Sequence, residues 1–319
     1  MTATNHRFGY VIAVVMSILA GMGVALQSRL NGELGLELGN GSLAALISFS
    51  TGLVILASAL GLSPRARRGM REVVQAVRRG DLPWWSIIGG LGGGILVLTQ
   101  GLVAGFLGVA LFSVAVVAGQ TFGALAIDTR GLIGFPRIPL ATPRILGALL
   151  VVAGIATTAS IGESAGGFSW QFLLPLVAGV GTGFQQALNG TVQRASQSAL
   201  AATFINFTMG TLILLVITLA SAPFVPAPTA LPTQWWLYFG GFVGTLFISI
   251  QTVTVNKIGL LGLGVSLVTG QVLGSILLDL FLPMGYHPVT VWTLVGAVLT
   301  VAGSALVTLT RLGTTRSSE

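Results

Sequence analysis

Long stretches without a charged residue are the feature of this sequence that most limits its fold. Residues 82–127 and 195–256 contain no Asp, Glu, Lys or Arg. Each stretch can hold two membrane-spanning helices, since one such helix needs about 20 mostly apolar residues. Only 7% of the 319 residues are charged and 53% are hydrophobic, so polar side chains are too few to coat a soluble globule. We therefore expect an all-α polytopic membrane protein.

The uncharged intervals predict ten transmembrane helices. Two helices are expected in each of the two long stretches, broken near residues 101–108 by glycines and near residues 223–232 by prolines, which lack an amide hydrogen. Single helices are expected in the remaining apolar intervals: 8–28, 38–64, 145–162, 164–193, 258–278 and 289–309.

The distribution of basic residues predicts the orientation of the chain, because Lys and Arg in short loops stay on the cytoplasmic side. With a cytoplasmic N-terminus, 14 of the 15 Lys and Arg residues would lie inside and only Arg29 outside. Both termini are therefore expected to be cytoplasmic (N-in/C-in). The net charge of +7 reflects this topology and a lipid-bilayer partner, with no nucleic-acid partner.

The chain contains an internal repeat. Ala20-Gly21-Met22-Gly23 followed by Gln27 and Asn31 recurs as Ala178-Gly179-Val180-Gly181 followed by Gln185 and Asn189. Later positions match in the same order: Phe49 with Phe207, Trp84-Trp85 with Trp235-Trp236, Gln100 with Gln251, Gly119-Gln120 with Gly270-Gln271, Asp128 with Asp279, and Gly147 with Gly296. A copy of five helices, an odd number, returns the second copy to the membrane upside down, so we predict inverted repeats at 1–161 and 162–319. A cleaved signal peptide is the alternative for the first apolar run, but a helix copied in mid-chain is not typical of a leader.

The most specific repeated element is G-x3-Q-x3-N-G, present as Gly23-Gln27-Asn31-Gly32 and Gly181-Gln185-Asn189-Gly190. With it the chain resembles, over nearly its whole length, the drug/metabolite transporter (DMT) superfamily and within it the YdcZ-type (EamA-like) bacterial inner-membrane proteins. The resemblance implies ten helices, a multi-pass location in the cytoplasmic (inner) membrane, a central cavity and alternating access, with a slight lean towards export.

Polar side chains at membrane depth are the candidate functional residues, since an unsatisfied amide in hydrocarbon costs roughly several kcal/mol. Spacing by four residues puts Gln27 and Asn31 on one helix face, and likewise Gln185 and Asn189. We expect the pseudo-symmetry to bring these two faces together to bind a polar solute; the alternative is that the amides join helices. The candidate substrate-binding residues are Gln27, Asn31, Gln185, Asn189, Gln100, Gln251, Gln120 and Gln271. Asn206 and Asn256 lack counterparts and are expected to be helix-end groups.

The repeat duplicates one pair of acidic residues, Asp128 and Asp279. They are weaker candidates for a coupling-ion site that takes up a proton. The alternative is that each carboxylate meets water or a neighbouring arginine, such as Arg130, near a helix end. No metal site is expected, and the glycines occur as GxxxG pairs that favour close helix packing.

The sequence therefore predicts a secondary transporter of a small metabolite or drug-like solute, with a non-transporting membrane scaffold or accessory subunit as the alternative. An enzyme is not expected, because paired carboxylates, a metal cluster and an activated nucleophile are missing from the pattern. No cofactor and no ATP-binding motif are expected, so an ion gradient, such as one of protons, the solute gradient or a separate partner would supply the energy. Two fused halves are compatible with a monomer or a homodimer.

Overall fold

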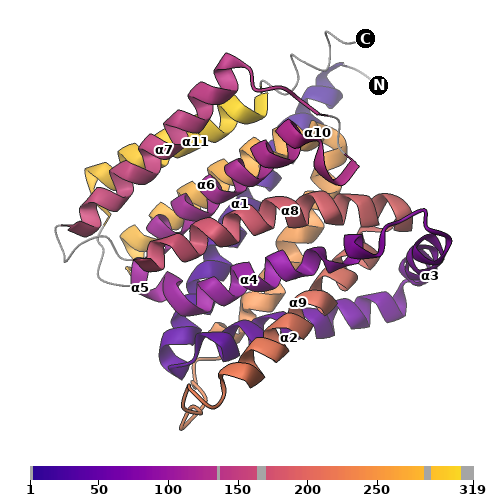
Figure 1. Ribbon diagram of the computed structural model, residues 1–319, viewed down its shortest axis with the longest axis horizontal. Coiled ribbons are helices and arrows are strands. Elements are labelled where there is room, and N and C mark those ends of the chain that lie inside the picture. Colours follow the sequence, from indigo (N-terminus) through magenta and orange to yellow (C-terminus); the bar gives the residue numbers. More distant parts are fainter. Residues whose placement is uncertain (1–2, 135–136, 164–169, 284–288, 310–319) are drawn as a thin grey trace.

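The computed structural model describes residues 3–134, 137–163, 170–283 and 289–309, and the regular structure within these ranges is helical. The α-helices in chain order are α1 (Ala3–Leu38), α2 (Gly41–Leu62), α3 (Pro64–Arg79), α4 (Gly90–Thr99), α5 (Gly105–Leu107), α6 (Val109–Arg130), α7 (Thr142–Glu163), α8 (Leu173–Ser196), α9 (Ala199–Ser221), α10 (Gly240–Phe281) and α11 (Val291–Leu309). Short helical turns adjoin them: η1 (Trp84–Gly89), η2 (Gln100–Ala104), η3 (Leu132–Gly134), η4 (Trp170–Phe172) and η5 (Trp235–Phe239). Most of the helices form one bundle (Figure 1).

Several helices are long and apolar enough to cross a membrane, so the chain is a multi-pass membrane protein. In the described part there are seven such segments: Gly9–Leu38, Gly41–Leu62, Trp84–Leu107, Val109–Arg130, Ala199–Ser221, Gly262–Phe281 and Val291–Thr308. Helix α7 contributes a shorter apolar segment, Thr142–Thr158. Ten spans therefore stay a prediction.

Two expected helix breaks are confirmed. Helix α5 ends at Leu107 and α6 begins at Val109, and Gly108 between them has φ 82° and ψ 155°. A side chain there would be strained, so glycine is required at this turn. The proline-rich stretch 223–232 separates α9 from η5.

The helix boundary expected at Lys257 falls where α10 changes direction. Residues from Gly240 to Phe281 are assigned to one helix, α10, yet both of its arms pack on the same part of α1. Thr254 bonds Ser17 at 3.0 Å, and Gly270 lies against the adjacent Ile18, although 16 residues of straight helix would span about 24 Å. The chain therefore turns back between Thr254 and Gly270.

Helix α3 was not expected, because its six arginines exclude it from a membrane interior. Its start is capped by Ser63, whose Oγ accepts from the amide of Ala66 at 3.3 Å, and it ends at Gly80 with φ 80°. Gly69 packs on the connection from α8 to α9, while all six arginines are exposed. These are Arg65, Arg67, Arg68, Arg71, Arg78 and Arg79.

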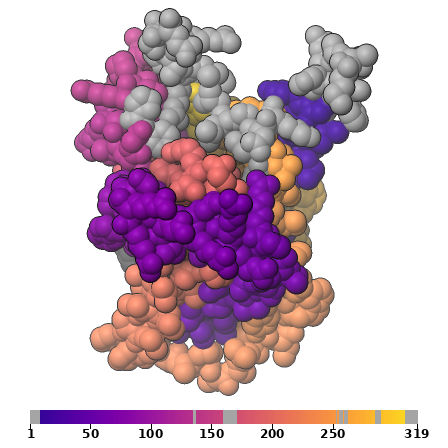
Figure 2. Space-filling model, turned by 90° about the vertical axis from the view of Figure 1, so that its right-hand side faces the viewer, coloured from indigo at the N-terminus to yellow at the C-terminus, as the bar shows by residue number. Residues whose placement is uncertain are grey.

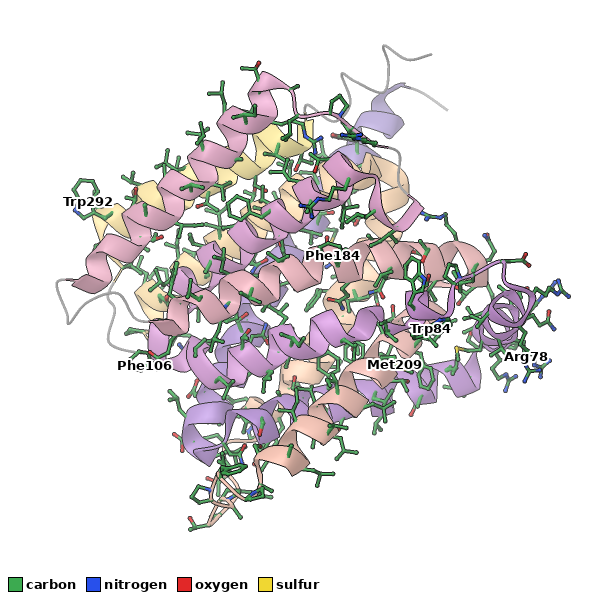
Figure 3. All side chains as sticks on the ribbon, in the orientation of Figure 1. Arg78, Trp84, Phe106, Phe184, Met209 and Trp292 are labelled. Atoms are coloured by element: carbon green, nitrogen blue, oxygen red, sulfur yellow. The ribbon has the colours of Figure 1, made fainter. Side chains whose placement is uncertain are left out.

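Helix α3 lies at the end of the bundle where α1 begins and α11 ends, on the right in Figure 1. Arg78 on this helix points away from the bundle in Figure 3. Figure 2 shows the molecule from this side, with α3 and the segment that follows it in purple across the middle. At the far side of the bundle in Figure 3, Trp292 at the start of α11 also points outward.

Corresponding positions of the two sequence copies make corresponding contacts. The most extensive helix pairs are α1 with α10, α7 with α11, α6 with α8 and α2 with α9. The rings of Phe49 and Phe207, which are equivalent in the repeat, stack with centroids 4.8 Å apart. A Cβ atom on Gly270 would overlap the carbonyl oxygen of Ile18, and one on Gly119 would overlap that of Leu176. This matching supports the predicted repeat.

We expect Gly270→Val to destabilise the bundle, because the added side chain would push the backbones of α1 and α10 apart. Overpacking of this kind costs about 1–3 kcal/mol, so the detergent-solubilised variant should melt at a lower temperature than the parent protein.

Gly61→Val is the matched control, since a Cβ atom on Gly61 meets nothing within 4 Å. Equal melting temperatures for the Gly270 and Gly61 variants would show that α1 and α10 do not pack this closely.

Candidate functional site

The side-chain amides of α1 lie in a buried hydrogen-bond cluster. The Nδ2 of Asn31 donates to Oε1 of Gln100 at 2.7 Å, and Nε2 of Gln100 donates to Oγ of Ser28 at 3.0 Å. Beside them, Nε2 of Gln27 donates to the carbonyl oxygen of Gly240 at 2.9 Å. Gln27 is 4% exposed, and Asn31 and Gln100 are fully buried. The cluster therefore ties α1 to η2 and to the start of α10.

Two oxygens near this cluster are buried without a hydrogen-bond partner among the described residues. They are Oδ1 of Asn31 and Oγ of Ser48 on α2. Both lie against Gly240, where a Cβ atom would overlap Asn31 Oδ1 and lie 2.8 Å from Ser48 Oγ. A buried acceptor or hydroxyl without a partner is costly. This location therefore suits a hydrogen-bond donor that does not belong to the described residues.

The amides of α8 form a second cluster around Asn206 of α9. The Oδ1 of Asn206 accepts from Nε2 of Gln185 at 2.8 Å and from Nδ2 of Asn189 at 3.2 Å. The prediction that Asn206 is a helix-end group was wrong: it is 3% exposed and lies about two turns from the nearer end of α9. The sequence signal was available, because Asn206 precedes Phe207 as the polar Ser48 precedes Phe49. Asn256 has its backbone within α10, and its side chain lies outside the described part.

The two clusters differ in accessibility. Gln185 and Asn189 are half-buried, unlike Gln27 and Asn31. The packing at the ends of these helices shows the same difference, since it is tighter at the end of α1 than at the end of α8. A Cβ atom on Gly32 would lie 2.6 Å from the amide nitrogen of Gly105, whereas one on the equivalent Gly190 would meet, among described residues, only the side chain of Arg194 at 3.9 Å. The α8 cluster is thus the less buried of the two.

The expectation that the α1 and α8 faces meet is still a prediction, since the hydrogen bonds found for these amides lead to other partners.

The remaining candidate glutamines lie in different surroundings. Gln100 belongs to the α1 cluster, and Gln271 is buried with no partner for its Nε2 among the described residues. Gln120 and Gln251 are half-buried. The backbones of Gln120 and Gln271 lie at the close approaches of α6 to α8 and of α10 to α1.

Asp279 sits at the helix break. Its two carboxylate oxygens accept from the amides of Val109 at 3.0 Å and Ala110 at 2.6 Å, the first residues of α6. The first amides of a helix have no partner within the helix, and a carboxylate also favours the positive end of the helix dipole. Three residues further on, the carbonyl oxygen of Leu282 accepts from Arg29, which also pairs with Glu33 at 3.4 Å.

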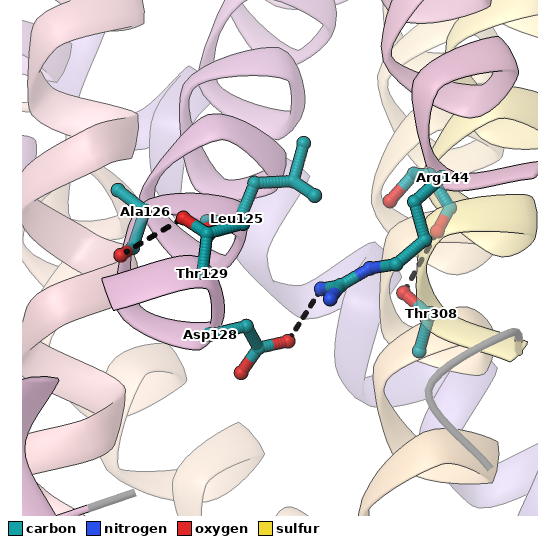
Figure 4. Close-up of polar contacts among 7 residues, drawn as sticks. Leu125, Ala126, Asp128, Thr129, Arg144 and Thr308 are labelled. Carbon is teal, nitrogen blue, oxygen red and sulfur yellow. Dashed lines mark hydrogen bonds and ion pairs between the residues drawn. The ribbon is translucent and has the colours of Figure 1, made fainter. Parts of the chain in front are cut away.

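Asp128 lies at the opposite end of α6 and forms a buried ion pair with Arg144 of α7. The Oδ2 of Asp128 and the Nη2 of Arg144 are 2.6 Å apart, and the side chains are 5% and 1% exposed (Figure 4). The sequence suggested an arginine partner for Asp128 and named Arg130; the observed partner is Arg144, whose spacing of 16 residues gave no local signal. Asp128 and Asp279 are not brought together. Their role as coupling-ion residues stays a prediction.

Comparison with known proteins identifies the family. A family model described as "Putative inner membrane exporter, YdcZ" matches residues 12–157 and 170–306, which together make up most of the chain. The chain belongs to this YdcZ family. The Escherichia coli K12 inner membrane protein YdcZ is 30% identical over 145 residues, which are 45% of this chain and 91% of that protein.

A solved crystal structure supports the fold of this YdcZ-family chain. It covers 94% of the chain and 96% of its own length with a TM-score of 0.57, at 18% sequence identity. Identity this low supports the fold alone. Membership of the family agrees with a transporter rather than an enzyme. Among the described residues, no group of three or more His, Cys, Asp and Glu could hold a metal ion.

We expect Asp128→Ala to destabilise this YdcZ-family protein strongly, because it leaves the guanidinium of Arg144 buried without its anion. Breaking a buried pair in this way costs about 3–5 kcal/mol, which should appear as a large drop in melting temperature in detergent. The double variant Asp128→Ala with Arg144→Leu removes both charges and should recover most of the loss.

Glu72→Ala is the control for the loss of a carboxylate, because Glu72 pairs at 3.0 Å with Arg68, whose side chain is 82% exposed. An exposed pair of this kind contributes little to stability. If the Asp128 and Glu72 variants melted alike, the buried pair would not be a stabilising feature.

Proposed function

We propose that this chain is a secondary transporter that exports a small polar or amphipathic solute across the cytoplasmic membrane. The transport unit is a bundle of ten spans, made of inverted halves at 1–161 and 162–319, with both termini cytoplasmic and alternating access between the halves. The family supports the proposal by its description as an inner-membrane exporter, and its two separate matched ranges support two halves. Placement of the basic helix α3 at the end of the bundle where α1 begins and α11 ends supports the orientation.

The amide cluster of the buried Asn206 with the half-buried Gln185 and Asn189 is the observation that carries the proposal. Three carboxamides in a membrane helix bundle offer donors and acceptors without a net charge. They suit an uncharged polar group of a solute, such as a hydroxyl or an amide, better than an ion. Membrane-buried polar groups of this kind mark substrate pathways when they border an accessible space.

The unequal burial of the two clusters supports alternating access. In an inverted-repeat transporter, equivalent residues of the two halves line opposite ends of one pathway. Burial of Gln27 and Asn31 together with partial exposure of Gln185 and Asn189 is the pattern expected when one end is closed and the other is accessible.

A membrane scaffold is the second candidate function, and a specific observation favours it. Gln27, Asn31 and Gln100 all direct their amide groups to partners in the protein, as helix-joining residues would. The α8 cluster distinguishes the two functions, since half-buried amides are not needed for packing alone.

Two energy sources are compatible with the proposed transport. A chain without an ATP-binding motif draws on an ion gradient or on the solute gradient. Proton coupling through Asp128 or Asp279 would require each carboxylate to leave strong partners, the guanidinium of Arg144 or two backbone amides. The solute gradient alone is therefore the simpler source.

We expect Asn206→Ala to abolish export, because Gln185 and Asn189 lose the acceptor that orients both of them. The measurement is metabolite profiling of cells and medium for strains that overproduce the parent protein or the variant at matched membrane levels. A compound enriched in the medium with the parent protein only would identify the substrate.

Gln193→Ala is the matched control, since Gln193 is on the same helix, α8, but its side chain is exposed. This variant should export like the parent. Identical profiles for the parent, Asn206→Ala and an empty strain would favour the scaffold, and loss of folded Asn206→Ala protein would show that the cluster serves packing.

A further inference from the structure

The side chain of Gln186 on α8 is exposed although it lies on the inner side of this helix. Val177, nine residues earlier, is 64% exposed and marks the lipid-facing side of α8. Nine residues are about two and a half turns, so Gln186 lies on the opposite side. One turn before Gln186, Thr182 is only 6% exposed. The inner side of α8 is therefore covered towards its start and uncovered towards its end.

An exposed carboxamide at this depth requires water. Gln186 lies ten residues, or about 15 Å, before the end of α8 at Ser196, and its side chain has no hydrogen bond among the described residues. A carboxamide without a partner in hydrocarbon is costly. Helix α8 is also 24 residues long, yet it is not among the segments apolar enough to cross a membrane. A water-filled space beside the end of α8 accounts for both observations.

The equivalent segment of α1 is closed. The offset of 158 residues between the two copies of G-x3-Q-x3-N-G takes Ser28 to Gln186. Ser28 is fully buried, and its Oγ accepts from Nε2 of Gln100 on η2 at 3.0 Å. The residue equivalent to Gln100 is Gln251, which is half-buried and has no side-chain hydrogen bond in the described part of the chain. The pair that closes one end thus has a counterpart, Gln186 and Gln251, that does not meet.

Helix packing shows the same difference. At the closed end α1 packs against η2, and glycine at 32 allows close approach to the backbone of Gly105. By contrast, α8 and α10 are not a closely packed pair within the described ranges. Gly190, the equivalent of Gly32, has no described neighbour that requires a glycine. Glycine inside a helix destabilises it relative to alanine, so a contact made in another state would explain Gly190.

A hydrogen bond without a counterpart in the repeat holds the first arm of α10 (residues 240–254) against α1. The Oγ of Ser17 donates to Oγ1 of Thr254 at 3.0 Å, and both side chains are buried. The equivalent positions are Pro175 and Val103, whose side chains cannot form this bond. In the observed state the arm that carries Gln251 is therefore held at α1 rather than at α8.

We propose that Gln186 and Gln251 form the gate at the end of the transport pathway where α3 lies. In the observed state this gate is open, and the two carboxamides offer donors and acceptors to an uncharged polar solute that enters here. In the alternate state the first arm of α10 moves to α8, Gln186 and Gln251 bond each other, and the Ser28–Gln100 pair at the opposite end separates. This proposal rests on the proposed alternating access and adds its gate residues.

The two gates are not identical. Gln186 is longer than Ser28, and Gln193 stands where Gly35 lies against the carbonyl oxygen of Gly101. A longer side chain at 186 suits the wider separation of helices that a glutamine at 193 imposes. The second gate therefore closes through its side chains, with Gly190 at the nearest approach of the two backbones.

Reaction of single cysteines with a charged thiosulfonate reagent tests the open end, in protein purified into lipid nanodiscs. The chain contains no cysteine of its own. Gln186→Cys should react about tenfold faster than Ser28→Cys, its buried equivalent, and than Val177→Cys, where the thiol faces lipid and does not ionise. A rate for Gln186→Cys as low as that for Val177→Cys would overturn the proposal, because Gln186 would then meet no water.

The reaction rate at Ser28→Cys then reports how often the opposite end opens. Gly190→Leu fills the open space beside α8 and blocks closure there, so it should lower this rate about tenfold. Gly61→Leu is the matched control, since Gly61 has no neighbour within 4 Å and its equivalent is Leu219; it should leave the rate unchanged. Ser17→Ala releases the first arm of α10 and should raise the rate about threefold, the effect of one hydrogen bond.

Opposite shifts with Gly190→Leu and Ser17→Ala, against no change with Gly61→Leu, would support the gate, and any other pattern would overturn it. Melting temperatures of the three variants show that each is folded. No solute is present in this experiment. Opposite shifts in a protein that exports nothing would therefore uphold the gate and reject the proposed function, whereas export that Gly190→Leu leaves unchanged would uphold export and reject the gate.

Discussion

Satisfaction of backbone hydrogen bonds inside the membrane is the constraint on which the rest of this structure depends. A helix meets it without help along its middle, but α6 begins after the turn at Gly108, and its buried first residues, Val109 and Ala110, leave amides that need a partner. The carboxylate of Asp279 supplies it from the other half of the chain. In the same way, Gln27 reaches across to the carbonyl oxygen of Gly240 at the start of α10. The two halves therefore complete each other's backbones, and neither half is a self-sufficient unit at these points.

Close backbone approach is what brings these partners within reach. Glycine at 240 lets Asn31 and Ser48 lie against α10, since a side chain would overlap the Oδ1 of Asn31. Gly89 has the equivalent place beside Asn189, where a Cβ atom would lie 3.1 Å from Oδ1. Glycine thus does two things in this chain: it allows the tight helix pairs of a membrane bundle, and it makes room for the amides that form the candidate site.

The sequence predicted those features that depend on local composition or on the repeat. Charge-free intervals and the proline-rich stretch at 223–232 located helices and their ends, and the repeat selected Gln185 and Asn189. Features that depend on packing were not predictable in this way. The partner of Asp128 is 16 residues away on another helix, and Asn206 was misjudged because its counterpart, Ser48, is a different residue type.

The two sequence copies differ in the charges around their shared aspartates. Each duplicated aspartate lies near an arginine that the repeat does not duplicate. The position equivalent to Arg144 is Thr293, and the position equivalent to Arg29 is Ala187. Arg144 holds Asp128 in a buried pair, whereas Arg29 binds the carbonyl oxygen of Leu282 and Glu33 and leaves the carboxylate of Asp279 to the amides of α6. A buried ion pair resists the loss of either partner, so Arg144 fixes Asp128 between α6 and α7. The two equivalent aspartates thus stabilise the bundle in different ways, one through an ion pair and the other by capping the start of a helix.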